Sequence, residues 1–199
     1  MVLAAGVSAR MGKPKLLLPL GDRTILEHSV AAVLGAGIEG AVVVLGDNAG
    51  AARDVIAAAF PARGDLHIIY NPDYMTGQAS SLRCGLAFCM KNVEAVLFCL
   101  GDQPWLSSGA IATLLQAYAS ASPRPLVAAP VHAGRRGNPV LFRAPLFAEL
   151  MLLKGDAGAR GLIERYAEDV LFVESGPEIL LDVDTPEDYL KLLSGAQRQ

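Results

Sequence analysis

Short apolar runs alternate with segments of helical periodicity along the first two thirds of the chain. Five runs rich in Val, Leu and Ile predict buried strands at Val2–Ala4, Ala41–Leu45, Leu66–Tyr70, Ala95–Leu100 and Leu126–Ala129. Between them, Leu26, Val30 and Val33 share one helical face, behind a capping box made by Thr24 and Glu27. The same spacing marks a second helix at Ile111, Leu114, Leu115 and Tyr118. This alternation predicts an α/β fold with a doubly wound, mostly parallel sheet.

After Ala129 the rhythm changes, and glycines and prolines interrupt the apolar runs. Here we expect strands over Pro139–Phe142, Val170–Val173 and Ile179–Leu181, and helices over Pro145–Leu153 and Ala159–Tyr166. The run from Thr185 to Asp188 places a Thr cap, a Pro and two acids at the start of another helix. The length of the chain favours one domain over residues 1–199.

Composition narrows the classes of function. Hydrophobic residues make up 52% of the 199 residues and charged residues 19%, which indicates a folded chain with a sizeable core. The formal charge of −3 argues against a basic nucleic-acid binder and a polybasic membrane-surface protein. We find no continuous apolar span of about 20 residues and no visible signal peptide. Together with three cysteines outside any CxxC motif, these features predict a cytoplasmic protein with reduced thiols.

A loop rich in small and basic residues follows the first predicted strand directly. Its small residues let a flat ring or a phosphate approach the backbone, and its glycines suit a loop whose N–H groups turn toward an anion. Arg10 and Lys15 add two positive charges, which a triphosphate needs. We therefore predict a nucleotide-binding loop that uses Leu3, Ala4, Ala5, Gly6, Ser8 and Gly12.

Acidic residues follow a predicted strand and recur near the end of the chain. Asp102 ends an apolar strand at its carboxyl edge, where open α/β sheets bind ligands, although an Asp there can also open the turn before Pro104. Asp182 and Asp184 alternate along an extended segment, so their carboxylates share one face and favour a cation between them. We predict that Asp102 and Asp184 hold Mg²⁺, with Asp182 as a third acid.

The segment from Asn71 to Ser81 leads from the third predicted strand into a helix. Gly77 allows a ligand to approach the backbone closely, and Ser81 offers a hydroxyl to the base or the ribose of a nucleotide. The alternative is purely structural, because Ser80 or Ser81 can also cap the helix.

Five motifs, taken in order, resemble those of the MobA-like nucleotidyltransferases, and the resemblance covers nearly the whole chain. They read LAAGxSxRMGxxK, GDQP, GRRGNPVLF, GDAGAR and LDVDTPEDY. The chain is most similar to the molybdenum cofactor cytidylyltransferase branch. The resemblance implies a Rossmann-like three-layer α/β/α fold and the transfer of a nucleotidyl group from CTP or GTP with Mg²⁺.

With this resemblance, the motifs receive expected roles in the transfer of CMP from CTP to the terminal phosphate of molybdopterin. Arg10, Lys15 and Asp102 would be catalytic, with Arg10 on the β- and γ-phosphates and Lys15 on the α-phosphate. The acceptor would be bound by Arg135, Arg136, Asn138, Gly155 and Asp156. Residues 1–123 would form the nucleotide-binding half, and residues 124–199 the acceptor-binding half with the second metal-ligand segment. A molybdenum hydroxylase or its maturation chaperone would be a partner.

Two positions refine the substrates that the resemblance implies. The related guanylyltransferases typically carry Gly-Gly where this chain has Ala5-Gly6, and a methyl group at Ala5 narrows the base pocket in favour of CTP over GTP. Cytidylyltransferases of this branch often carry His where this chain has Asn138, so the acceptor site departs from the family pattern.

Several alternatives remain open at this point. One is a cytidylyltransferase for a sugar or polyol phosphate, a second is a guanylyltransferase that uses GTP, and a third is a non-catalytic chaperone for the molybdenum cofactor. A nicotinamide-dependent oxidoreductase is disfavoured, because the first loop lacks the GxGxxG pattern.

Overall fold

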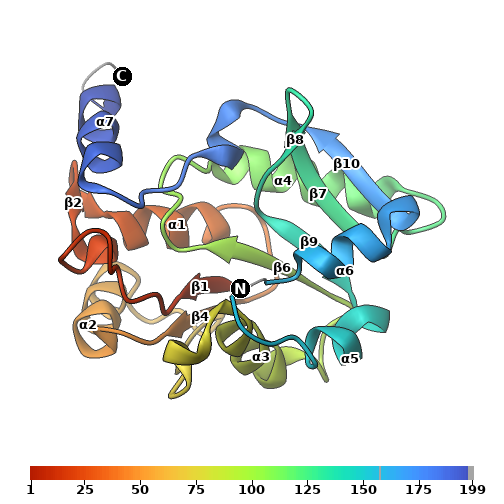
Figure 1. The fold of residues 1–199 in the computed structure, drawn as a ribbon, viewed down its shortest axis with the longest axis horizontal. Coiled ribbons are helices and arrows are strands. Elements are labelled where there is room, and N and C mark those ends of the chain that lie inside the picture. The colour runs from red at the N-terminus through yellow and green to blue at the C-terminus, as the bar shows by residue number, and fades with distance from the viewer. Residues whose placement is uncertain (157, 197–199) are drawn as a thin grey trace.

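One mixed sheet organises the molecule in the computed structural model, which describes residues 1–156 and 158–196 (Figure 1). The sheet has the strand order β10-β7-β9-β6-β1-β4-β5, with β8 paired to β7. The strands are β1 (Val2–Ala4), β4 (Ala41–Leu45), β5 (Leu66–Tyr70), β6 (Ala95–Leu100), β7 (Val127–His132), β8 (Arg135–Arg136), β9 (Val140–Arg143) and β10 (Val170–Glu174). β1 pairs in parallel with β4 and β6, and β4 with β5, whereas β9 runs antiparallel to both β6 and β7. Strands from both ends of the sequence therefore share one sheet.

Helices cover both faces of this sheet. On one face lie α1 (Ile25–Leu34), α2 (Ala49–Ala59) and α4 (Ser108–Ser120), and on the other lie α3 (Gln78–Cys89), α5 (Phe147–Leu150) and α6 (Arg160–Arg165). The alternation of side chains along each strand divides the core between the two faces. In β4, Val43 and Leu45 pack with the first set of helices, while Val42 and Val44 pack with the second set. The expected Rossmann-like three-layer α/β/α fold is confirmed.

A small additional core connects the end of the chain to its beginning. Helix α7 (Pro186–Ala196) lies beside the hairpin of β2 (Pro19–Leu20) and β3 (Arg23–Thr24), as Figure 1 shows. Met11, Leu20, Val183 and Leu192 are buried together there, and the hydroxyl of Tyr189 donates to the carbonyl of Pro19 at 2.6 Å. This packing holds the segment before α7 against the loop that follows β1.

Most elements lie where the sequence predicts them. Both expected helix starts are present: Thr24 and Glu27 form a capping box before α1, and Thr185 exchanges hydrogen bonds with Asp188 before α7. Over the expected helix at Pro145–Leu153, a 3₁₀ turn at Ala144–Leu146 leads into α5.

One local expectation is wrong, and one open alternative is excluded. Residues 179–181 do not form a strand, because Pro177 starts a 3₁₀ turn over Pro177–Leu180. The apolar character of this run reflects burial of Ile179 in the core, where its carbonyl accepts from the Asn138 N–H. Neither Ser80 nor Ser81 caps α3, since the helix already begins at Gln78 and both serines lie inside its first turns.

Two features bear on the expected environment of the chain. None of the helices in the described part of the molecule combines the length and the apolar character needed to cross a membrane. All three cysteines are free thiols. Cys99 is fully buried in β6, and this burial raises the pKa of its thiol to about 11, so it stays protonated at neutral pH.

Candidate active site

The loop after β1 folds back on itself and presents its start and its end to the same cavity. Ser8 and Gly12 adopt positive φ angles of 51° and 67°, which turn the chain sharply at both positions. The Ser8 hydroxyl accepts a hydrogen bond from the Lys15 N–H at 3.2 Å, and Met11 anchors the loop in the small core beneath α7. The loop therefore carries Lys15 back to the carboxyl edge of the sheet.

Lys15 lies between two carboxylates that are distant in sequence. Its ammonium donates to Asp102 at 2.6 Å and to Asp184 at 2.9 Å, and its side chain is only 12% exposed. Arg10 completes the group from the solvent side, since it donates to the other oxygen of Asp184 at 2.7 Å. β6 positions Asp102, and the hydrogen bond from the Val183 N–H to the Asp102 carbonyl holds the Asp184 segment alongside.

The pKa values of these groups follow from their contacts. Burial by itself lowers the pKa of Lys15, but the carboxylates of Asp102 and Asp184 outweigh burial and raise it above its ordinary value. Burial tends to raise the pKa of Asp184, yet the hydrogen bond from Lys15 and the charge of Arg10 hold it below the ordinary value. Lys15 and Asp184 are therefore both charged at neutral pH.

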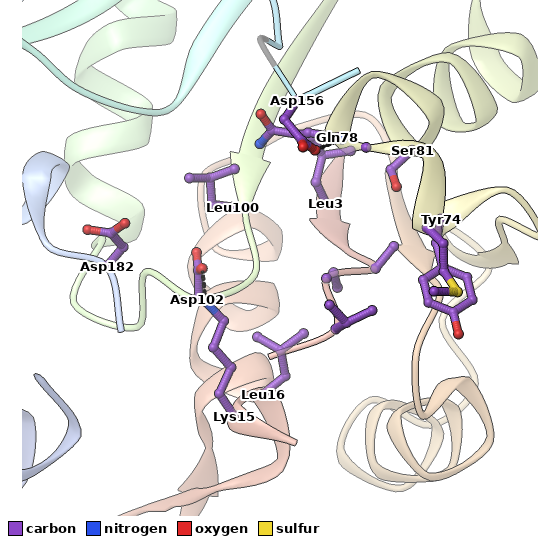
Figure 2. Close-up of a pocket in the computed structure, with 16 residues that line it drawn as sticks. Leu3, Lys15, Leu16, Tyr74, Gln78, Ser81, Leu100, Asp102, Asp156 and Asp182 are labelled. Carbon is purple, nitrogen blue, oxygen red and sulfur yellow. Dashed lines mark hydrogen bonds and ion pairs between the residues drawn. The ribbon is translucent and has the colours of Figure 1, made fainter. Parts of the chain in front are cut away.

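Asp182 has no such cation in contact. Burial, followed by the negative charges of Asp102 and Asp184, raises its pKa above the ordinary value. Figure 2 shows Asp182 to the left of Asp102, whereas Lys15 lies below it. The three predicted acids thus converge on one edge of the sheet, but Lys15 contacts only two of them.

The residues fit a hard divalent cation in one specific respect. The Oδ1 atom of Asp102 is buried and has no hydrogen-bond partner, which leaves a carboxylate oxygen available as a ligand. Within residues 1–156 and 158–196, however, no three His, Cys, Asp or Glu side chains are grouped closely enough to hold a metal by themselves. The reason is visible at Lys15, whose ammonium lies between Asp102 and Asp184.

A cavity of about 470 Å³ opens beside this charged group (Figure 2). Of the predicted site residues, its lining includes Leu3, Ala4, Ala5, Gly6, Lys15, Gly77, Ser81, Asp102, Asp156 and Asp182. Residues that the sequence did not single out also line it: Val7, Leu16, Tyr74, Met75, Gln78 and Leu100. A cavity of this size lies within the usual range for small-molecule sites. We call it the first pocket.

The start of α3 forms the wall opposite Lys15. Asn71, buried at the end of β5, donates through its amide to the hydroxyls of Ser80 and Ser81 at 2.9 and 3.0 Å. These hydrogen bonds fix the rotamer of Ser81. Because the Ser81 hydroxyl oxygen accepts from Asn71, its own proton points toward another acceptor. The role expected for Ser81 therefore depends on Asn71, a residue that sequence reasoning placed in the motif but gave no function.

Gly77 lies where the start of α3 touches the loop at Gly155. Its φ angle is +108°, and a Cβ atom there would lie 2.5 Å from the Gly155 carbonyl carbon. Beside it, the Ala79 N–H donates to the Gly155 carbonyl at 3.0 Å and the Gln78 N–H to the Asp156 carboxylate at 3.2 Å. Gly155 and Asp156, expected at the acceptor, thus lie at the start of α3 and Asp156 lines the first pocket.

The remaining residues expected at the acceptor lie elsewhere. Arg136 and Asn138 line a second pocket, of about 240 Å³, which shares Leu3, Gln78 and Leu100 with the first. Arg135 is exposed and is not part of either lining. Ser8, Gly12, Arg10 and Asp184 shape or flank the first pocket without lining it. The sequence carries no signal for Gln78, because its position at the border of both pockets depends on the tertiary structure.

Comparison with known proteins places this geometry in a family. A model described as the MobA-like NTP transferase domain matches residues 1–170. Nicotine blue oxidoreductase of Paenarthrobacter nicotinovorans is 34% identical, with 97% of this chain and 95% of that protein covered. Molybdenum cofactor cytidylyltransferase of Escherichia coli is 25% identical, with 96% and 92% covered.

Among solved structures, Rv0371c of Mycobacterium tuberculosis in complex with manganese superposes with a TM-score of 0.77 at 30% identity, covering 97% of this chain and 96% of that one. The likeness extends over the full length of each of these proteins, so both pockets fall within the shared region. The resemblance inferred from the five motifs is confirmed: this chain belongs to the MobA-like NTP transferase family.

Proposed function

We propose that this protein transfers CMP from CTP to the terminal phosphate of molybdopterin and releases pyrophosphate. The proposal rests mainly on the position of Lys15, which Asp102 and Asp184 hold at the edge of the first pocket. That pocket is large enough for a nucleotide, and its opposite wall borders a second pocket. Membership of the MobA-like family and the full-length likeness to a molybdenum cofactor cytidylyltransferase support this assignment.

The reaction needs positioning more than acid–base chemistry. An oxygen of the acceptor phosphate forms a bond to the α-phosphorus of CTP, and the bond from that phosphorus to the oxygen bridging to the β-phosphate breaks. The electron pair leaves with pyrophosphate, and no proton has to be removed because the attacking phosphate is already ionised. Catalysis then consists of holding the two substrates in line and stabilising the charge that develops on the α-phosphate.

Each charged residue has a place in this scheme. The backbone from Gly6 to Gly12 would hold the β- and γ-phosphates together with Arg10, whose guanidinium is already turned to the site by Asp184. Lys15 would leave the carboxylates and contact the α-phosphate. Asp102 and Asp184 would then hold Mg²⁺, which supplies neutralisation of phosphate charge when bound.

The base preference rests on Ala5 in the wall of the first pocket. Ala5 is buried and lines the pocket, so its methyl group occupies space that a purine would need. We expect CTP to be preferred over GTP, and Ala5→Gly to reduce that preference. If the unaltered protein already prefers GTP, the argument from the Ala5 methyl group fails.

The direct test is pyrophosphate release with CTP, Mg²⁺ and a molybdopterin source, followed by the mass of the product. Asp102→Asn removes one carboxylate charge without changing the size of the side chain, and should lower turnover by about 10²–10³-fold. Asp22→Asn, an exposed residue in the hairpin turn between β2 and β3, is the matched control. Turnover of Asp102→Asn near that of the control would remove Asp102 from the reaction.

The same assay separates the alternatives. A product carrying GMP would indicate a guanylyltransferase, and transfer to a sugar or polyol phosphate would indicate a different acceptor. CTP binding without pyrophosphate release would indicate a chaperone that holds the cofactor, for example for a molybdenum hydroxylase.

A second candidate function follows from one of the comparisons. The relative that is 34% identical over 97% of this chain is named an oxidoreductase, which is not a nucleotidyltransferase activity. A nicotinamide cofactor also carries nucleotides, and its nicotinamide ring, which is no larger than a pyrimidine, could lie against Ala4–Gly6 in the wall of the first pocket. Oxidation of NADH or NADPH in the presence of an oxidised dye, with no release of pyrophosphate from CTP, would favour this candidate over the proposed one.

A further inference from the structure

The strand β5 ends the sheet, and β4 is its one partner among the strands of the described residues. At the two ends of this pair, the Ala41 N–H donates to the Asp65 carbonyl at 2.7 Å, and the Asn71 N–H donates to the Leu45 carbonyl at 2.8 Å. In a parallel pair, every second residue of a strand bonds to the same neighbour. These two bonds therefore assign the odd-numbered residues of β5 to β4, and the even-numbered ones face away from the sheet.

The outward backbone groups of β5 are those of Leu66, Ile68 and Tyr70. The Leu66 N–H reaches the Arg63 carbonyl at 3.4 Å, and the Tyr70 carbonyl accepts from the Cys84 thiol at 3.7 Å. Both contacts are long, and the two backbone groups of Ile68 have no partner in the part of the chain that the structure describes. An edge of this kind is a template for pairing with another strand.

The usual features that protect an edge strand are missing from β5. Residues 66–70 contain no proline and no Lys, Arg, Asp or Glu, and their register with β4 is continuous, without a bulge. Aromatic side chains lie along this edge instead. Tyr70 is 54% exposed, and Phe88 of α3 is 48% exposed, with its ring centroid 5.1 Å from that of His67. The edge is thus both unpaired and largely apolar.

We propose that β5 pairs in antiparallel orientation with β5 of a second copy of this chain, about a two-fold axis at Ile68. One continuous sheet then runs through the dimer. The inference does not rest on the proposed function, because no residue of β5 lines either pocket.

This register gives every outward backbone group a partner. About an axis at Ile68, the two copies of that residue exchange both of their hydrogen bonds, and Tyr70 does the same with Leu66 of the second copy. Leu66 and Ile68 pack on the side of the sheet that α2 covers, and alternation places Tyr70 on that side too. The exposed ring of Tyr70 would therefore lie beside Leu66 of the second copy, which is a favourable cross-strand pair.

The charges beyond the ends of β5 agree with this pairing. Arg63 precedes the strand and Asp73 follows it; both are exposed, and they are equally distant from Ile68 along the sequence. The two-fold axis brings Arg63 of one copy toward Asp73 of the other, at both ends of the paired strands. Opposite charges across an antiparallel pair are favourable.

The other edge of the sheet lacks this complementarity. At β10, Asp169 immediately precedes the strand and Glu174 ends it. Antiparallel pairing of two copies of β10 would bring these acids together at each end, which is unfavourable. A two-fold pair through β5 alone also closes into a dimer, whereas pairing at both edges would continue into a fibre.

Sedimentation velocity over a series of protein concentrations tests the inference. Five paired residues make a small interface, so we expect a weak dimer that forms as the concentration rises. Tyr70→Lys places a charge at the exposed edge and should weaken dimerisation by about tenfold or more. Phe172→Lys is the matched control, because Phe172 is 50% exposed on the other edge strand. Circular dichroism of both variants verifies that they are folded.

Two results would overturn the proposal. The first is an unaltered protein that stays monomeric up to about 0.5 mM, a range that includes weak dimers. The second is a folded Tyr70→Lys variant that dimerises as well as Phe172→Lys, since the dimer would then use another surface.

Oxidative cross-linking of Ile68→Cys tests the register. In the proposed pair, the Cα atoms at this position lie about 5.5 Å apart, a separation that a disulfide spans. We expect a cross-linked dimer, with the disulfide mapped by peptide mass to position 68 of both copies and thus distinguished from links through Cys84 or Cys89. Phe172→Cys, at the centre of β10, should not cross-link. Absence of the link at position 68, or an equal yield from Phe172→Cys, would overturn the pairing about Ile68.

Discussion

Replacing Lys15 with Met is the perturbation that the site geometry predicts most sharply. The substitution keeps the length of the side chain and removes the ammonium that contacts Asp102 at 2.6 Å and Asp184 at 2.9 Å.

At an effective dielectric constant of about 20, the attraction between the ammonium and each carboxylate is about 6 kcal/mol before desolvation. Desolvation offsets most of this gain, and removal of one partner from a fully buried pair costs about 3–5 kcal/mol. Since Asp102 and Asp184 are 19% and 28% exposed, solvent screens them in part. We therefore expect Lys15→Met to lower the free energy of unfolding by about 2 kcal/mol.

The loss should depend on pH with a defined sign. The folded-state pKa of Asp184 lies below its ordinary value of 3.8, so its contribution is present above that value and disappears as the pH falls through the lowered pKa. The folded-state pKa of Lys15 lies above 10.5, so its contribution is present below that value and disappears as the pH rises through the raised pKa. The difference between the unaltered protein and Lys15→Met should therefore be largest between about pH 4 and pH 10.

Urea denaturation at pH 7 measures the effect, with Lys13→Met as the matched control because Lys13 is exposed two residues away. Adding Asp184→Asn to Lys15→Met should restore part of the lost stability, because one of the two uncompensated carboxylates is gone. Mg²⁺ should stabilise Lys15→Met more than the unaltered protein, since no ammonium competes for the carboxylates. A loss no larger than that of Lys13→Met, or a further loss on adding Asp184→Asn, would refute the reasoning.

Three further substitutions test the scaffold. Gly77→Ala should lower the free energy of unfolding by about 1–3 kcal/mol, because φ is +108° and the new Cβ would lie 2.5 Å from Gly155. Gly161→Ala, inside α6 with no atom within 4 Å of the new Cβ, should instead raise it by about 0.5–1 kcal/mol in the same urea titrations. Thr24→Ala removes the hydroxyl that accepts from the Glu27 N–H at 3.3 Å, and should cost about 1 kcal/mol by thermal unfolding, with Thr24→Ser near neutral.

The fold was predictable where burial and local pattern agree. The bounds of β4, β5 and β6 coincide with the apolar runs. For β4 and β6 the reason is that a strand covered on both faces needs apolar side chains at nearly every position. The expected burial of Leu66–Tyr70 is wrong, because β5 lies at the edge of the sheet and its residues are only partly buried or exposed. The same rule fails at Ile179, whose burial comes from a single side chain inserted into the core from a 3₁₀ turn. A run of three apolar residues cannot distinguish these cases, and Pro177 is the residue that could have prompted the distinction.

The residues of the site could be predicted from the sequence, but the contacts between them could not. That Asp102 lies at the ligand-binding edge follows from its place after a strand, because carboxyl ends of parallel strands meet at one edge. That Lys15 contacts it does not follow, since the two residues are 87 positions apart and the loop that leads to Lys15 is shaped by the positive φ angles of Ser8 and Gly12. Gln78 shows the same limit: its place between two pockets depends on a glycine contact with a loop near residue 155. The roles assigned to these residues in the reaction stay predictions.

The charges at the first pocket argue that the nucleotide enters together with a cation. Arg10 and Lys15 face the carboxylates of Asp102, Asp182 and Asp184, and Asp156 also lines the pocket, so the group as a whole does not attract a triphosphate. A triphosphate that drew Lys15 away would leave Asp102 and Asp184 facing its own negative charges, and this arrangement is unfavourable at a partly desolvated edge. A divalent cation that takes the place of the ammonium removes the conflict, and the unpartnered oxygen of Asp102 is available to bind it. If the proposed reaction holds, we therefore expect the Lys15 ammonium to stabilise the carboxylates before the nucleotide binds. Asp102 and Asp184 would hold Mg²⁺ once Lys15 has moved to the phosphate.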